Sequence, residues 1–97
     1  MKTVVIQIGN SDDKLPQSRW HWFIKDVQQA VRMFCEQVHF NGSSAGDALY
    51  QNYCMVAEVL ESREIALTQN LAHLAKKYDQ DSIAVTFGET IFVKDNT

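Results

Sequence analysis

Two cysteines and a histidine are the residues best suited to chemistry in this sequence. Cys35 and His39 are four residues apart, and Cys54 lies in an apolar segment. A thiolate and an imidazole on one side of a helix can bind zinc, or act as a nucleophile with its base. A zinc site needs further ligands, and the sequence has no CxxC or HxxxH pair to supply them. Apolar surroundings also favour inert thiols, so we predict no catalytic residue, no metal and no cofactor.

A surface suited to recognition lies on the longest amphipathic segment. Trp22, Asp26, Gln29 and Met33 follow one another at four-, three- and four-residue steps. This spacing places them on one outward helical face, about 200° around the helix from Trp20, which belongs to the apolar stripe. Tryptophan and methionine are enriched at protein interfaces, so this face predicts a contact site. The alternative is that a fifth strand, a loop or the chain terminus covers Trp22.

The segment from Phe40 to Asn52 is the other candidate for recognition. It carries Leu49 and Tyr50 between polar residues, and loops held on a rigid sheet often carry function. The competing interpretation is a simple strand connection, in which Leu49 and Tyr50 pack against the core.

Two helices must position these residues. The first is expected to begin near residue 16, because proline suits the first turn of a helix. Its apolar residues recur at steps of three and four, through Trp20, Phe23, Ile24, Val27, Ala30, Val31, Phe34 and Val38. The second has Ser62 as its expected N-cap and carries Leu67, Leu71, Leu74 and Tyr78 on one face, with Lys76 and Lys77 at its end.

Four strands are predicted beside the helices, and a fifth is left open. Residues 3–8 and 53–60 carry apolar side chains on both faces, which favours central strands covered on both sides. A short strand begins at 39–40, before a loop or hairpin connection over 41–47. Residues 82–87 alternate as a strand does. After Gly88, residues 90–93 either return in a type II′ hairpin, adding the fifth strand, or continue one long bulged strand.

The resulting order, β-α-β-β-α-β, predicts an α+β fold of the ferredoxin-like kind. It is a two-layer sandwich in which two helices cover one face of an antiparallel sheet, and its first and third strands are central. With 97 residues, the chain is expected to form a single α+β domain over 1–97.

Composition narrows the class of protein. The sequence is 45% hydrophobic and 10% aromatic, which argues against disorder. Its formal charge of −3, without a run of basic residues, disfavours nucleic acid as a partner. The apolar run Val4–Ile8 is too short for a secretory signal, and no segment is long enough to cross a membrane. We therefore expect a cytoplasmic protein with reduced cysteines and no membrane partner.

The first functional hypothesis is a small acidic, non-enzymatic protein-interaction module. Its first helix or a sheet edge would bind another protein or a second copy, giving a homodimer. By analogy with small phage and mobile-element proteins, it could inhibit or regulate a larger host enzyme. The alternative is a dimeric ferredoxin-like (α+β barrel) binder of small molecules, or a cofactor-free enzyme using His39, Tyr53 and Cys54. The sequence favours the non-enzymatic role without identifying the partner, the oligomeric state or a ligand pocket.

Overall fold

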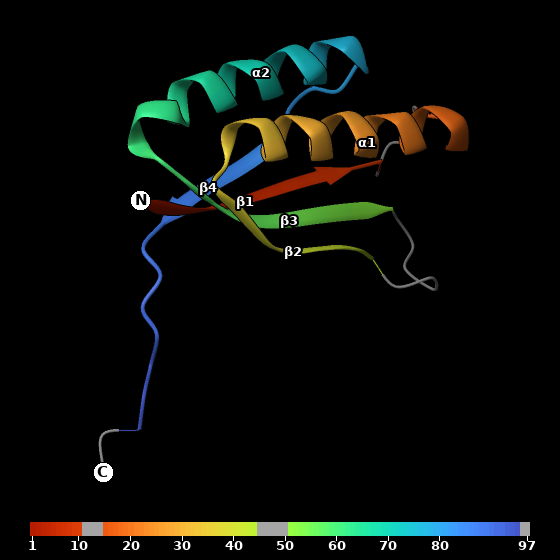
Figure 1. Cartoon of the computed structure of the whole chain (residues 1–97). Coiled ribbons are helices and arrows are strands. Elements are labelled where there is room, and N and C mark those ends of the chain that lie inside the picture. The colour runs from red at the N-terminus through yellow and green to blue at the C-terminus, as the bar shows by residue number, and fades with distance from the viewer. Residues whose placement is uncertain (11–14, 45–50, 96–97) are drawn as a thin grey trace.

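The computed structural model describes residues 1–10, 15–44 and 51–95 and shows an α+β fold. Its elements in chain order are β1 (Lys2–Gly9), α1 (Gln17–Phe34), β2 (Gln37–Ser43), β3 (Asn52–Val59), the short 3₁₀ helix η1 (Glu61–Arg63), α2 (Glu64–Lys77) and β4 (Ala84–Gly88). The helices lie side by side over one face of a four-stranded sheet, as Figure 1 shows. No helix in the described part of the chain is long and apolar enough to cross a membrane.

The sheet has the strand order β2-β3-β1-β4, and every neighbouring pair is antiparallel. β1 and β3 pair along their whole length, from Lys2 opposite Val59 to Gly9 opposite Asn52. The prediction that the first and third strands are central is therefore confirmed. The edges of the sheet are β2 and β4.

The core lies between the helices and one face of the sheet. Because side chains alternate along a strand, β1 and β3 each send every second residue toward the helices. The buried residues of the core are Val4, Ile6 and Ile8 from β1, Tyr53, Met55, Ala57 and Val59 from β3, Trp20, Phe23, Val27, Ala30 and Val31 from α1, Leu67, Leu71 and Leu74 from α2, and Leu15 and Tyr78 beside the helices. The helical stripes predicted from three- and four-residue spacing thus form the core.

The other face of the sheet corrects a prediction. Residues 3–8 and 53–60 were expected to be covered on both faces, but both helices lie on one side (Figure 1). Val5 and Val56 point to the other side and are only half-buried. These apolar side chains therefore lie on the open face of the sheet. No second layer covers that face in the described part of the chain.

The entry into α1 is fixed by a buried amide. The Asn10 side chain donates to the Leu15 carbonyl at 2.9 Å and accepts from the Leu15 N–H at 3.1 Å. Asn10 is only 3% exposed, so satisfying its polar atoms is necessary for folding. The helix begins at Gln17, directly after Pro16, as the sequence predicted.

Three boundaries differ from the sequence prediction. β2 extends to Ser43 and takes in residues 41–43, which were expected in a loop, and its register shifts between Val38 and Phe40. Residues 90–93 form neither the return strand nor the long bulged strand that were considered for them: β4 ends at Gly88, and the described residues 89–95 form no strand. A type II′ turn needs a positive φ at its glycine, and no described glycine has one. Ser62 lies within η1, so it does not cap α2.

Candidate functional site

The outer surface of α1 exposes two large apolar side chains. Trp22 is 61% exposed and Met33 is 60% exposed, whereas Trp20, two residues earlier than Trp22, is buried. The buried stripe fixes the rotation of the helix, so the opposite side must face outward. Gln29 lies on the same exposed side. The described residues therefore leave most of the Trp22 side chain uncovered, and residues 89–95 run away from both helices (Figure 1).

Asp26, the fourth predicted interface residue, is held by α2. Its carboxylate accepts hydrogen bonds from Tyr78 Oη at 2.6 Å and from Lys77 Nζ at 3.0 Å. Burial raises the pKa of Asp26, but these two hydrogen bonds and the charge of Lys77 together outweigh burial and lower it. Burial, followed by the hydrogen bond to Asp26 and its charge, raises the pKa of Tyr78 to about 12. Asp26 thus fastens the two helices together.

A shallow groove runs between the helices beside these residues. It has a volume of about 270 Å³ and is lined by Asp26, Gln29, Ala30 and Met33 from α1 and by Asn70, Leu74 and Lys77 from α2. Trp22 lies one turn before Asp26 on the same helix and is not part of the lining. The structure therefore brings three of the four predicted residues to one groove, with Trp22 beyond its Asp26 end.

The charge of this surface differs from that of the whole chain. α1 contains Arg19, Lys25 and Arg32, and Asp26 is its one carboxylate. Because Asp26 is paired with Lys77, the exposed side of α1 is cationic in a protein with a net charge of −3. Arg19 also donates to the Lys77 carbonyl at 3.0 Å, which further ties α1 to the end of α2.

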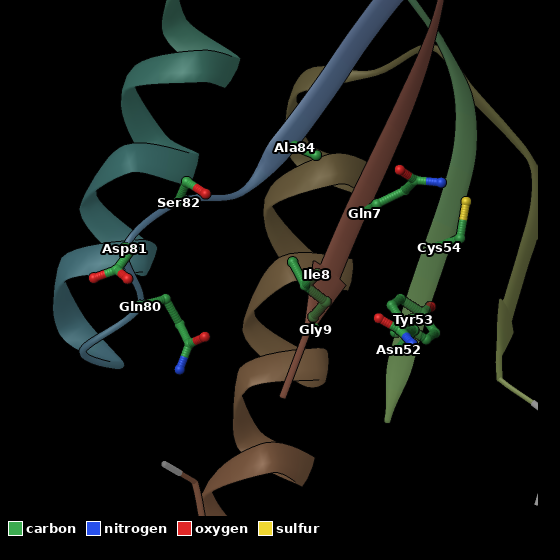
Figure 2. Close-up of a pocket in the computed structure, with 10 residues that line it drawn as sticks. All are labelled: Gln7, Ile8, Gly9, Asn52, Tyr53, Cys54, Gln80, Asp81, Ser82 and Ala84. Carbon is green, nitrogen blue, oxygen red and sulfur yellow. The ribbon is translucent and has the colours of Figure 1, made fainter. Parts of the chain in front are cut away.

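A second hollow, of about 470 Å³, lies where β1 ends, β3 begins and the chain enters β4. Figure 2 shows its lining, which includes Gln7 and Ile8 from β1, Asn52, Tyr53 and Cys54 from β3, and Gln80, Asp81 and Ser82 from the segment after α2. These residues come from three separate stretches of sequence. Amides at strand ends have no characteristic spacing, so sequence reasoning missed this cleft.

The thiol and imidazole groups are not brought together. α1 ends at Phe34, so Cys35 caps the helix while His39 lies in β2. The four-residue relationship would have needed the helix to continue. His39 Nε2 lies 3.4 Å from the Glu58 carboxylate, and Glu58 is four residues, or about 13 Å, from Cys54 along β3. No group of three metal-ligating side chains occurs among the residues that the structure describes.

The remaining candidates have structural surroundings or cannot be placed. Burial and then the neighbouring Glu36 raise the pKa of Cys35 to about 11, which disfavours the thiolate that a nucleophile requires. The Tyr53 hydroxyl accepts a hydrogen bond from Gln28 Nε2 at 2.7 Å, and the residue is buried. Leu49 and Tyr50, the predicted recognition residues of the loop, lie outside the described residues.

Compared with known proteins, the chain matches no protein-family model and no curated protein sequence.

Proposed function

We propose that this chain is a non-enzymatic protein-interaction module that binds an acidic surface of another protein through the outer side of α1. The observation that carries the proposal is the exposure of Trp22 and Met33 on a helix whose opposite side is locked into the core. A rigid helix presenting a tryptophan loses little conformational freedom on binding, which favours affinity. Tryptophan is also the residue type most enriched among those that dominate binding energy.

The positive charges on the exposed side of α1 indicate what kind of partner it binds. Lys25 and Arg32 lie on the exposed side of α1, next to Trp22 and Met33 in helical projection. Cations around an apolar anchor attract an acidic partner and repel a basic one. An acidic protein surface with an apolar pocket for Trp22 is therefore the expected partner. Binding of this kind could inhibit or regulate a larger enzyme by covering its working surface.

We further assign the fold to the ferredoxin-like arrangement. The strand order β2-β3-β1-β4, the antiparallel pairing and the two helices on one face support this assignment. In such a sandwich the helical layer and the free sheet face can bind different partners at once. The interaction surface on α1 therefore leaves the opposite face of the sheet available for a second interface.

The test compares protein capture by the wild type, by Trp22→Ala and by Lys25→Glu/Arg32→Glu. Ile65→Ala is the matched control, because Ile65 is an apolar residue on α2 that is 71% exposed, against 61% for Trp22. A partner identified by capture is then titrated with each purified variant. We expect the loss of Trp22 to weaken binding about thirtyfold, as for a residue worth about 2 kcal/mol, and Ile65→Ala to leave it unchanged. Equal binding by the wild type and Trp22→Ala would rule the proposal out.

A second candidate function, small-molecule binding, is favoured by the cleft of Figure 2. Its amides and hydroxyl, from Gln7, Asn52, Gln80 and Ser82, would suit a polar ligand with several hydrogen-bonding groups. Amide NMR spectra recorded with a library of polar metabolites test this function. It predicts shifts confined to the ends of β1 and β3, and no shift at this cleft with any compound would eliminate it.

A further inference from the structure

We propose that the uncovered face of the sheet is a homodimer interface, on which a second copy packs face to face while the two C-terminal tails clasp the opposite subunit. The interface is separate from the α1 surface, because the helices lie on the other side of the sheet (Figure 1). The homodimer and the proposed function of α1 can therefore be tested separately.

The composition of this face is the first argument. One row of directly opposed residues crosses all four strands, from Phe40 to Val56, Val5 and Thr86. The next row runs through Gly42, Cys54, Gln7 and Ala84. A sheet face in contact with water normally alternates to polar and charged side chains. Both central rows here are uncharged, as at the core of a subunit interface.

Phe40 adds a large exposed aromatic ring to this face. It is 57% exposed, and its ring lies against the Gly42 backbone, where a Cβ atom would be only 2.9 Å from Phe40 Cζ. Glycine at this position therefore allows the ring to lie along the sheet. A hollow of about 260 Å³ beside the ring, reaching to Cys54, offers space for an apolar side chain of a facing subunit.

A second copy suits this face better than a charged partner does. The one carboxylate that the described strands place on this side, Glu58, lies at its margin within 3.4 Å of the His39 imidazole. Two identical uncharged centres bring no like charges together. A two-fold axis would therefore join them without electrostatic cost.

The C-terminal tail is the second, independent argument. Residues 89–95 follow β4 without forming a strand, and Figure 1 shows them running away from the helices. Within them Ile91, Phe92 and Val93 are 79%, 75% and 88% exposed. Three consecutive apolar residues of high strand propensity are unusual on a free surface and mark a contact.

The root of the tail fixes its direction. The hydroxyls of Thr3 and Thr90 are hydrogen-bonded, and Thr3 lies on the open face of the sheet, opposite Gly88 of β4. Beyond Thr90 the chain leaves the sheet on that side (Figure 1). A copy packed against the open face would thus meet the tail, which can extend along it.

Reach and area agree with this arrangement. The described residues 91–95 span about 17 Å when extended, which exceeds the roughly 14 Å between the outer strands of a four-stranded sheet. The open face covers only about 440 Å² in projection, because β1 and β3 have eight residues, β2 seven and β4 five. A stable interface hides about 800 Å² per partner, so the face alone is too small and the tail supplies the additional area.

The test is the solution mass of the full chain, measured by light scattering. Protein concentrations from about 5 to about 200 µM cover the dissociation constants expected for such a dimer. Val56→Arg places a charge at the centre of the open face, and Thr86→Arg places one in the same row at its β4 edge. The triple change Ile91→Asp, Phe92→Asp and Val93→Asp places three charges in the tail. Trp22→Glu, on the helical side, is the matched control.

We expect the wild type and Trp22→Glu to be dimers. In the other three variants the dissociation constant of the dimer should rise at least about a hundredfold, because each variant buries charge at the interface. Circular dichroism verifies that each variant is folded. Thr86→Arg serves where Val56→Arg does not fold, because residue 86 is already polar and exposed. A monomeric wild type, or a dimer that Trp22→Glu dissociates and the open-face and tail variants preserve, overturns the proposal.

Discussion

Tyr78 donates its phenolic hydrogen to the carboxylate of Asp26 across 2.6 Å, joining the end of α2 to the middle of α1. The two residues are 52 positions apart in sequence. The ring of Tyr78 also stacks on Phe23, with ring centroids 4.9 Å apart, so one side chain contributes to the core and to the helix-helix contact. Asp26 also lines the groove between the helices, beside Gln29 and Met33.

The Asp26–Tyr78 pair predicts how stability depends on pH. The folded-state pKa of Asp26 is lowered, so its contribution is present above the unfolded pKa, about 3.9, and is lost as pH falls through the folded value. The pKa of Tyr78 is raised to about 12. Its contribution is complete below the unfolded value of about 10 and is lost as pH rises toward 12.

Urea denaturation at pH 3, 7 and 10.5 checks this dependence for the wild type, Asp26→Asn and Tyr78→Phe. Each substitution should lower the free energy of unfolding at pH 7 by about 1.5–3 kcal/mol, the usual range for a hydrogen bond to a charged group. Their effects should not add, because both weaken the same contact: Asp26→Asn removes the charge of the acceptor and Tyr78→Phe removes the donor. Additive losses would show that the hydrogen bond does not couple the helices.

The two tryptophans should respond in opposite ways to truncation. Trp20 is buried, and Trp20→Ala should cost about 3–5 kcal/mol because it leaves a large cavity. Trp22 is exposed, and Trp22→Ala should change stability by no more than about 0.5 kcal/mol. Denaturant titrations measure both values. Comparable losses at the two positions would mean that Trp22 is packed within the monomer.

Asp79 predicts a stabilising substitution. It has φ of 55°, the left-handed conformation that follows the end of α2, where Gln80 N–H bonds back to the Ala75 carbonyl. Glycine adopts this conformation without strain, so Asp79→Gly should raise stability by about 0.5–1 kcal/mol. Asp79→Ala lacks that freedom and serves as the control. A lower midpoint of thermal unfolding for Asp79→Gly than for the wild type would contradict the prediction.

Cys35 should be a slow thiol. Its pKa is raised to about 11, chiefly by burial, so only a small fraction is thiolate near neutral pH. In a Cys54→Ser variant, alkylation by iodoacetamide should accelerate about tenfold per pH unit from pH 7 to 10. Mass spectrometry follows the reaction. A rate that levels off below pH 9 would show an ordinary or activated thiol.

Local patterns predicted the elements whose surroundings are simple. The spacing from Trp20 to Phe34 correctly indicated α1, and the β-branched runs indicated β1 and β3 as central strands. Both signals depend only on residues that are neighbours in sequence. The same spacing also placed Trp22 and Met33 on one exposed side of the helix.

Long-range relationships were not predictable in the same way. The hydrogen bond from Tyr78 to Asp26 and the cleft around Gln7 and Gln80 both join segments that only the fold brings together. The prediction that both faces of residues 3–8 are covered was wrong. An apolar side chain such as Val5 on the second face of a strand does not reveal whether anything packs against that face. Two interpretations were open for residues 88–93, a hairpin or one long bulged strand, and the backbone forms neither: β4 ends at Gly88, which lacks the positive φ of a type II′ turn.

Whether α1 is a binding surface is decided by comparing how tightly the wild type, Trp22→Ala and Ile65→Ala bind a partner captured from the source organism. The account predicts an acidic partner whose dissociation constant rises about thirtyfold with Trp22→Ala and stays unchanged with Ile65→Ala. It also predicts weaker binding at high salt. The same affinity for all three proteins would contradict a binding surface on α1.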